Sequence, residues 1–155
     1  MPEQPAALFL VRHGKADEPW DYDHDFERPL TRKGKHDVAA LAKVLIQEQR
    51  VPECIISSPA FRAAQTARRL AAEFGLNPEA IQYESALYPG TEEAYVQCIQ
   101  NSGSGSVMLV AHNPVIEALV FRLSGGILKQ VPTSGCAVFA IAANGAAELV
   151  FHHFG

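Results

Sequence analysis

The sequence predicts a three-layer α/β/α sandwich with a mainly parallel central sheet. Three observations support this fold class. Short apolar runs rich in β-forming residues alternate with stretches of helical periodicity, a strong hairpin signal stands near the carboxyl end, and 155 residues suffice for one domain with a substantial core. The sequence has no internal repeat and no linker. We therefore expect residues 1–155 to form a single domain, with residues 1–5 as a flexible tail.

The strands are expected where apolar runs are bounded by polar residues, Gly or Pro, at 6–11, 54–57, 107–111, 136–142 and 147–152. The last two runs flank Asn144-Gly145, a dipeptide typical of a tight hairpin turn. The earlier runs alternate with helices, and this alternation favours parallel pairing. Cys54 and Cys136 lie in such runs, so both are expected to be small buried hydrophobes.

The predicted helices cover about 31–49, 60–74 and 91–99, and a fourth begins at 113 and closes at the glycines 125–126. Thr31 and Thr91 are expected to cap the first and third helices. Ser58 is expected to cap the second, with Pro59 at its first helical position. The segment 76–90 is expected to be irregular.

Residues 15–29 are predicted to form a long polar loop. Three aspartates alternate in it like the start of a calcium-binding loop, at positions 21, 23 and 25. Phe26 and Arg32 stand where such a loop needs glycine and glutamate, so we reject calcium. We expect a solvated loop of the kind found beside functional sites. One hypothesis for its acidic run, from Asp17 to Glu27, is that it steers basic protein surfaces.

Composition excludes several classes of function. With a formal net charge of −4, the chain is not expected to present the basic surface that nucleic-acid binding needs. No apolar run reaches the length of a membrane span, and Met1–Ala7 lacks the basic start of a signal peptide. The three cysteines are odd in number and form no Cys-x-x-Cys pair, so neither disulfide nor zinc knuckle is expected. We expect a cytoplasmic protein whose oligomeric state the sequence leaves open.

Basic and imidazole side chains stand where the predicted parallel strands end. Arg12 and His13 follow the first strand, His112 follows the third, and Arg62 lies near the start of the helix after the second. Because the carboxyl ends of such strands share one edge of the sheet, we expect these four side chains to meet in a crevice. Helix N-termini near 58 and 113 would point free backbone N–H groups at the same place.

This combination of groups suits phosphate. Guanidinium groups match phosphate oxygens two at a time, and helix N-termini favour anions. A neutral histidine can attack phosphorus and form a phosphohistidine intermediate that water then hydrolyses, while a second histidine stabilises the transition state. The chemistry needs no metal and no cofactor. His24, His36 and the pair His152-His153 show no zinc-ligand spacing, so we expect no metal site.

Four ordered motifs resemble those of the histidine phosphatase superfamily: Arg12-His13-Gly14; Arg28-Pro29-Leu30-Thr31 with Gly34; Ser57-Ser58-Pro59 with Arg62, Ala63, Gln65 and Thr66; and Ala111-His112-Asn113-Pro114. The length and spacing look most like the SixA-type phosphohistidine phosphatases, and the resemblance spans residues 8 to about 140. It implies a phosphoglycerate-mutase-like fold. It also implies that His13 is the phosphorylated nucleophile, that Arg12 and Arg62 clamp phosphate, and that His112 is the second pocket histidine.

The chain departs from larger, mutase-type relatives, which carry a glutamate acid on an insertion before the final histidine. Glu84 is the nearest candidate general acid here, and a surface glutamate is its alternative interpretation. A missing strong acid favours phosphohistidine, because its P–N bond breaks easily. We therefore expect hydrolysis of phosphohistidine on a phosphorylated protein. The alternatives are a phosphomonoesterase for a small phosphorylated metabolite and a non-catalytic module that binds phosphate or phosphoprotein.

Overall fold

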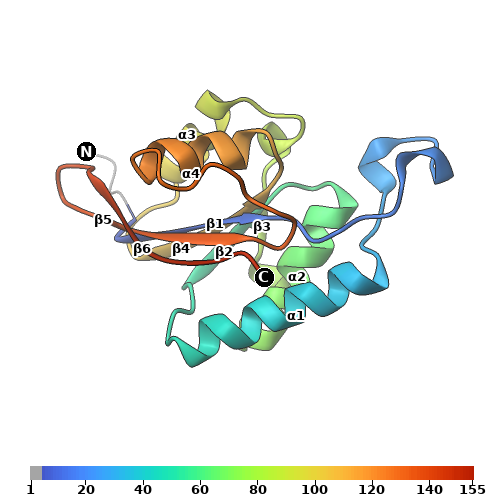
Figure 1. Cartoon of the computed structure of the whole chain (residues 1–155), viewed down its shortest axis with the longest axis horizontal. Helices are drawn as coiled ribbons and strands as arrows, with labels where there is room; N and C mark the ends of the chain where they lie inside the picture. The colour runs from blue at the N-terminus through green and yellow to red at the C-terminus, as the bar shows by residue number, and fades with distance from the viewer. Residues whose placement is uncertain (1–4) are drawn as a thin grey trace.

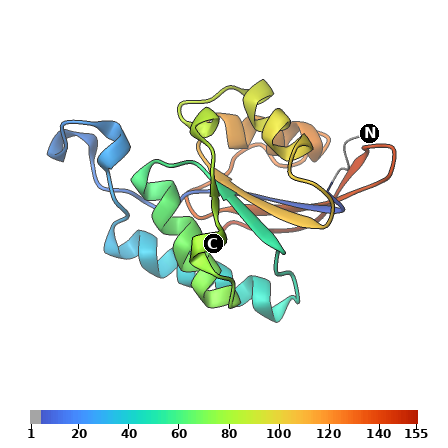
Figure 2. The same cartoon turned by 180° about the vertical axis from the view of Figure 1, so that it is seen from behind.

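The computed structural model describes residues 5–155 and places a six-stranded sheet between two pairs of α-helices (Figures 1 and 2). The strands are β1 (Ala7–Arg12), β2 (Cys54–Ser57), β3 (Gln82–Tyr83), β4 (Ser106–Ala111), β5 (Cys136–Ile141) and β6 (Ala147–His153). Across the sheet their order is β3-β2-β4-β1-β5-β6. The three-layer sandwich predicted from the sequence is confirmed.

The sheet is mainly parallel. β4 pairs in parallel with both β1 and β2, and β2 pairs in parallel with β3, whereas β5 runs antiparallel to β1 and β6. The predicted hairpin joins β5 to β6, and Gly145 in its turn has a φ of +87°, a conformation that favours glycine. Since β4 lies between β1 and β2, the carboxyl ends of these three strands are adjacent at one edge of the sheet.

The helices α1 (Arg32–Gln47) and α2 (Phe61–Phe74) cover one face of the sheet, while α3 (Glu92–Gln100) and α4 (Val115–Leu123) cover the other (Figure 1). Successive residues of β1 supply both cores. Phe9 and Val11 pack with α1 and α2, and Leu8 and Leu10 pack on the opposite side. This double burial explains why the strand is an unbroken apolar run rather than an alternating one. No helix in the region 5–155 is long and apolar enough to cross a membrane.

The caps of α1 and α3 are as predicted: the hydroxyl oxygens of Thr31 and Thr91 accept from the N–H of Gly34 and Ala94. The predicted end of α1 is two residues too long, since Gln49 has a φ of +56°.

The prediction that Ser58 caps α2 is wrong, because the helix begins at Phe61 with Ala60 as its N-cap and no side-chain cap. Ser58 directly follows β2, and its N–H donates to the carbonyl of Val110 at 3.0 Å.

Three other sequence expectations need adjustment. The segment 76–90 contains β3 and the 3₁₀ turns η3 (Pro78–Ala80) and η4 (Ser85–Leu87), so it is more regular than expected. Cys54 is half-buried rather than buried, whereas Cys136 is fully buried as predicted. In the predicted flexible tail, Pro5 is buried and residues 1–4 lie outside the described residues.

Candidate active site

The site lies where β1 and β4 end. These strands are parallel neighbours and pair Arg12 with Ala111, so the next residue of each strand, His13 and His112, project at the same edge. The centroids of the two imidazole rings are 5.1 Å apart. Both side chains are buried, with exposed fractions of 8% and 6%. Two residues separated by most of the chain are thus brought together by strand pairing alone.

His13 is held with one defined ring nitrogen free to react. Its Nδ1 lies 2.7 Å from the carbonyl oxygen of Gly14, which can only accept, so Nδ1 carries the proton. The lone pair therefore sits on Nε2, which accepts at 3.3 Å from Nε of Arg62. Burial, together with the positive charges of nearby arginines, lowers the pKa of His13 to about 4. At neutral pH the ring is a neutral base with its lone pair on Nε2.

His112 is likewise neutral. Burial, followed by the neighbouring His13 and Arg62, lowers the pKa of His112 to about 3. Its Nε2 lies 2.7 Å from the hydroxyl oxygen of Ser58, which also accepts from the N–H of Ala60 at 3.2 Å. Either the hydroxyl or the ring nitrogen can be the donor in the contact between Ser58 and His112. Nδ1 of His112 has no hydrogen-bond partner within residues 5–155, although it is buried.

Arg62 enters the site from the first turn of α2. Only 6% of the residue is exposed. Its Nη1 donates to the backbone carbonyl of Asp25 and its Nη2 to the Asp25 carboxylate, each at 2.9 Å. The sequence predicts that the side chains of Arg12, His13, Arg62 and His112 meet in one crevice, and the structure places all four on the lining of one pocket. The sequence analysis did not foresee a carboxylate on Arg62.

Arg12 reaches the same space from the end of β1. Its Nη1 donates to the carbonyl of Val131 at 3.1 Å, while its buried Nε has no partner in the described part of the chain. Burial lowers the pKa of Arg12, and the charge of Glu117 partly opposes this shift. The guanidinium is therefore anchored through Nη1.

These groups line a pocket of about 290 Å³ that is bordered by Arg12, His13, Lys15, Ala16, Arg28, Arg62, His112, Asn113 and Thr133. Four of these side chains are cationic and none is acidic, so the pocket attracts anions. Asp25 lies directly beside this lining, on Arg62 and Arg28. Glu84, the candidate acid from the sequence, is exposed and lies outside the lining. The structure does not bring Glu84 to the histidines.

Sequence reasoning missed several contributors to the site. Arg28 lies in a motif that it recognised, yet no periodicity or strand end pointed its side chain at the pocket. Ser58 was expected to cap a helix and instead contacts His112. Thr66 lies one turn beyond Arg62, and its hydroxyl accepts from the N–H of Gly14 at 3.0 Å. Asp25 belongs to a loop that was interpreted as solvated. The motifs that contain Arg28, Ser58 and Thr66 were signals for those three residues, whereas no motif contained Asp25.

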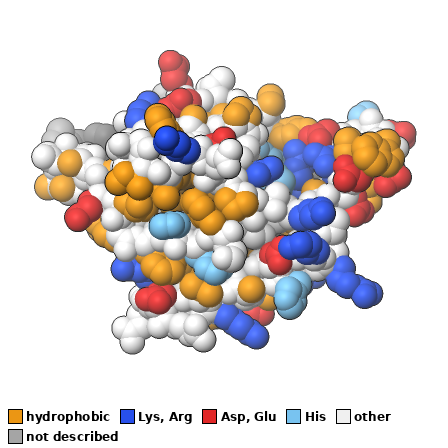
Figure 3. Space-filling view, viewed as in Figure 1, with side chains coloured by type: hydrophobic (Ala, Val, Ile, Leu, Met, Phe, Trp, Pro, Cys, Tyr) orange, Lys and Arg blue, Asp and Glu red, His pale blue; other side chains and the backbone are white. Residues whose placement is uncertain are grey.

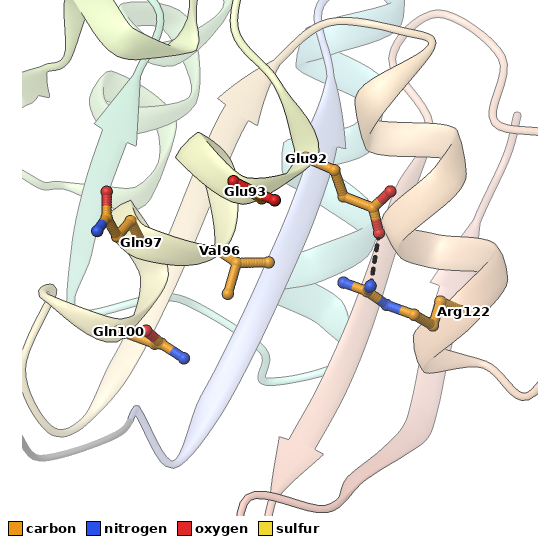
Figure 4. Close-up of a pocket in the computed structure, with 6 residues that line it drawn as sticks. All are labelled: Glu92, Glu93, Val96, Gln97, Gln100 and Arg122. Atoms are coloured by element: carbon orange, nitrogen blue, oxygen red, sulfur yellow. Dashed lines mark ion pairs between the residues drawn. The ribbon is translucent and has the colours of Figure 1, made fainter.

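A larger hollow of about 510 Å³ lies elsewhere, between α3 and α4, lined by Glu92, Glu93, Val96, Gln97, Gln100 and Arg122 (Figure 4). Its one arginine is already paired with Glu92 at 2.8 Å, as the dashed line in Figure 4 shows. This lining offers neither a histidine nor a free cation for catalysis. We therefore assign the chemistry to the smaller pocket. Within residues 5–155, no group of three or more His, Cys, Asp and Glu side chains is arranged to hold a metal ion.

Comparison with known proteins identifies the family. The family model described as "Histidine phosphatase superfamily (branch 1)" matches residues 8–87. The chain belongs to this superfamily. It is 32% identical over 123 residues to the phosphohistidine phosphatase SixA of Escherichia coli K12, covering 77% of this chain and 74% of that protein. Family membership makes the chain a phosphatase, and the resemblance inferred from the four sequence motifs is confirmed.

Solved structures agree with this assignment. A protein histidine phosphatase SixA complexed with tungstate superposes with a TM-score of 0.79 and 28% identity, covering 96% of both chains. A candidate SixA from Agrobacterium tumefaciens superposes with a TM-score of 0.82 and 28% identity, covering 96% of this chain and 97% of that chain. The histidine phosphatase fold thus extends over nearly the whole chain, including the end of β4 that carries His112.

Proposed function

We propose that this histidine phosphatase removes the phosphoryl group from phosphohistidine on a protein, through a covalent intermediate on His13. Nε2 of His13 attacks phosphorus with its lone pair. The P–N bond of the substrate breaks with its electrons going to the ring nitrogen of the leaving histidine, whose other ring nitrogen carries a proton, so that the ring departs as neutral imidazole. Water then attacks the phosphorus of phospho-His13, releases inorganic phosphate and returns neutral His13. The hydrogen bond from Nδ1 to Gly14 supports this role, because it keeps the reactive lone pair on Nε2.

The surrounding cations would bind the phosphoryl oxygens. Arg12 and Arg62 are the proposed clamps, and Arg28 and Lys15 add positive charge to the same lining. At an effective dielectric near 20, a guanidinium about 4 Å from one unit of phosphate charge gains roughly 4 kcal/mol. Neutral His112, which borders the same lining, would stabilise the phosphoryl group in the transition state by a hydrogen bond.

The observation that supports the choice of substrate is that, among residues 5–155, no carboxylic acid lines the pocket. Asp25 stands beside it, and although burial acts to raise the pKa of Asp25, hydrogen bonds from Tyr88, Arg62 and Arg28 lower it to about 2. At neutral pH that carboxylate cannot donate a proton to a leaving alkoxide. An imidazole protonated at its other ring nitrogen leaves phosphorus as a neutral ring and needs no acid from the enzyme, so the lining suits a P–N bond better than a sugar phosphate.

The rival functions remain separable by experiment. A phosphomonoesterase for a small phosphorylated metabolite would use the same intermediate, and a module that only binds phosphate or phosphoprotein would use the same cations. The experiment that tests the proposal measures kcat/KM on a phosphohistidine peptide, an aryl phosphate and a panel of sugar phosphates, with the His13→Asn variant as the inactive control, or blank. Preference for the peptide, lost in the blank, supports the proposal. Preference for a metabolite overturns the substrate, and phosphate binding without any turnover overturns catalysis.

The proposal also includes a phosphorylated protein as the natural partner and a cytoplasmic location. The cytoplasmic location is supported by the three cysteines, Cys54, Cys98 and Cys136, all of which are free thiols. The net charge of −4 supports a partner other than nucleic acid.

A further inference from the structure

Asp25 contacts more of the active-site wall than any sequence pattern suggested. Its Oδ1 accepts from Nε of Arg28 at 2.9 Å, with Nη2 of Arg28 at 2.8 Å. Its Oδ2 accepts from Nη2 of Arg62 at 2.9 Å and from the hydroxyl of Tyr88 at 2.7 Å. One carboxylate therefore connects two arginines of the pocket lining with a tyrosine whose ring lies 5.4 Å from that of His112.

The loop that carries Asp25 extends from the body of the fold between β1 and α1 (Figures 1 and 2). Figure 3 shows acidic and hydrophobic side chains at its tip and basic side chains where it joins the body. The adjacent Phe26 anchors this part of the loop. Its ring packs edge-on against Tyr88 at 5.3 Å and Phe61 at 5.9 Å. Asp25 is thus held at the pocket by packing as well as by charge.

The contacts form a chain that ends on the reactive atom. A guanidinium is planar, so fixing its two terminal nitrogens fixes the direction of Nε. Asp25 holds Nη1 of Arg62 with its backbone carbonyl and Nη2 with its carboxylate, and Nε of the same group then faces Nε2 of His13. The aromatic ring of Tyr88 lies against the same guanidinium, with its centroid 5.8 Å from the Arg62 guanidinium carbon. The orientation of Arg62 at the nucleophile therefore depends on Asp25.

We propose that Asp25 is a positioning residue, which orients the Arg62 and Arg28 guanidiniums around His13 for phosphoryl transfer. This inference deepens the proposed function and rests on it for its catalytic consequence. Asp25 acts through the arginines and forms no bond to phosphorus. Its contribution is geometric, because two long side chains with several rotatable bonds are held in one arrangement before the substrate arrives.

The loop provides a matched control. Asp23 stands two residues away, is exposed, and makes no side-chain hydrogen bond or ion pair with the part of the chain that the structure describes. Asp23→Asn and Asp25→Asn remove the same charge from the same loop. If the negative charge of the loop only steers substrates, the two variants behave alike. If Asp25 positions the arginines, only its own variant is impaired.

The kinetic test uses the full chain and whichever phosphate substrate it hydrolyses fastest. We expect Asp25→Asn to lower kcat by about tenfold or more, with a smaller change in KM, because misplaced arginines lose transition-state contacts. Asp23→Asn should stay within about twofold of the parent, and Asp25→Glu should recover part of the rate. Tyr88→Phe removes one hydrogen bond without changing charge and should lower kcat less. Equal losses at positions 23 and 25, or a faster Asp25→Asn enzyme, would overturn the proposal.

A second measurement does not depend on turnover. The ¹⁵N chemical shift of Nε2 in His13 reports whether that atom accepts a hydrogen bond from Arg62. In Asp25→Asn this shift should move toward that of a free, unprotonated imidazole nitrogen, and in Asp23→Asn it should not. Tyr88→Phe should move it part of the way, and that variant serves if Asp25→Asn does not fold. If the His13 signal does not move in Asp25→Asn, the positioning role of Asp25 is wrong, whether or not any substrate is hydrolysed. If the signal moves but the parent protein hydrolyses no substrate, only the proposed function is wrong.

Discussion

Mild acid should destabilise the fold through the two active-site histidines, and His13 gives the most direct test. Its pKa is about 4 in the folded protein against 6.5 for an ordinary histidine. Between these values the unfolded chain binds more protons than the native one, so the free energy of unfolding rises with pH. The contribution is therefore fully present above pH 6.5 and is lost as the pH falls toward 4. The perturbation is a change from pH 7 to pH 5.

The linkage relation gives the magnitude. At pH 5 an unfolded histidine is almost fully protonated, whereas His13 in the fold is mainly neutral. The difference costs about 2 kcal/mol relative to pH 7, to order of magnitude. His112, with a folded-state pKa of about 3, adds a cost of similar size over a window that extends lower. Asp25 has a lowered pKa of about 2, so its own stabilising contribution is lost only at more acid pH.

The assay is urea denaturation of the parent protein and His13→Asn at both pH values. Asparagine keeps a donor near the position of Nδ1 for the carbonyl of Gly14 but does not titrate. Subtracting the two unfolding free energies removes the groups that both proteins share. The advantage of the parent should shrink by about 2 kcal/mol between pH 7 and pH 5. A constant difference would refute the depressed pKa of His13, and a growing one would show the opposite shift.

Three substitutions test other parts of the site. Arg62→Ala should lower kcat/KM by about 100-fold or more and, because it also removes one of the three side chains that bind Asp25, reduce the unfolding free energy by about 1–3 kcal/mol. Full activity in a steady-state assay would contradict this prediction. Glu84→Gln should leave kcat within about twofold across the pH range, since the side chain is exposed outside the pocket lining, and a loss near 100-fold would reinstate it as the general acid. Gly34→Ala should cost about 1–3 kcal/mol in thermal or urea denaturation, because a Cβ there collides with the carbonyl oxygen of Lys15. An unchanged denaturation midpoint would show that the backbone near Lys15 shifts to accommodate the methyl group without loss of stability.

The sequence alone determined the elements whose signals are local. An unbroken apolar run predicted β1, threonines at the correct spacing predicted the starts of α1 and α3, and Asn144-Gly145 predicted the final hairpin. Each of these signals acts within a few residues, through backbone hydrogen bonds or burial of one face. The clustering of Arg12, His13 and His112 was predictable for a related reason, because parallel strands end at the same edge of a sheet.

Only the tertiary structure decided which other polar side chains surround the two histidines. Ser58 carries the signature of a helix cap, yet it lies at the end of β2 and contacts His112 from there. Asp25 carries the signature of a solvated loop, yet it holds Arg62 from 37 positions away in the chain. Side-chain contacts of this kind have no periodicity to detect, since their energy is gained only when separate elements have packed. The two candidate histidines could therefore be predicted from the strand ends, whereas the arrangement of the charges around them could be seen only in the fold.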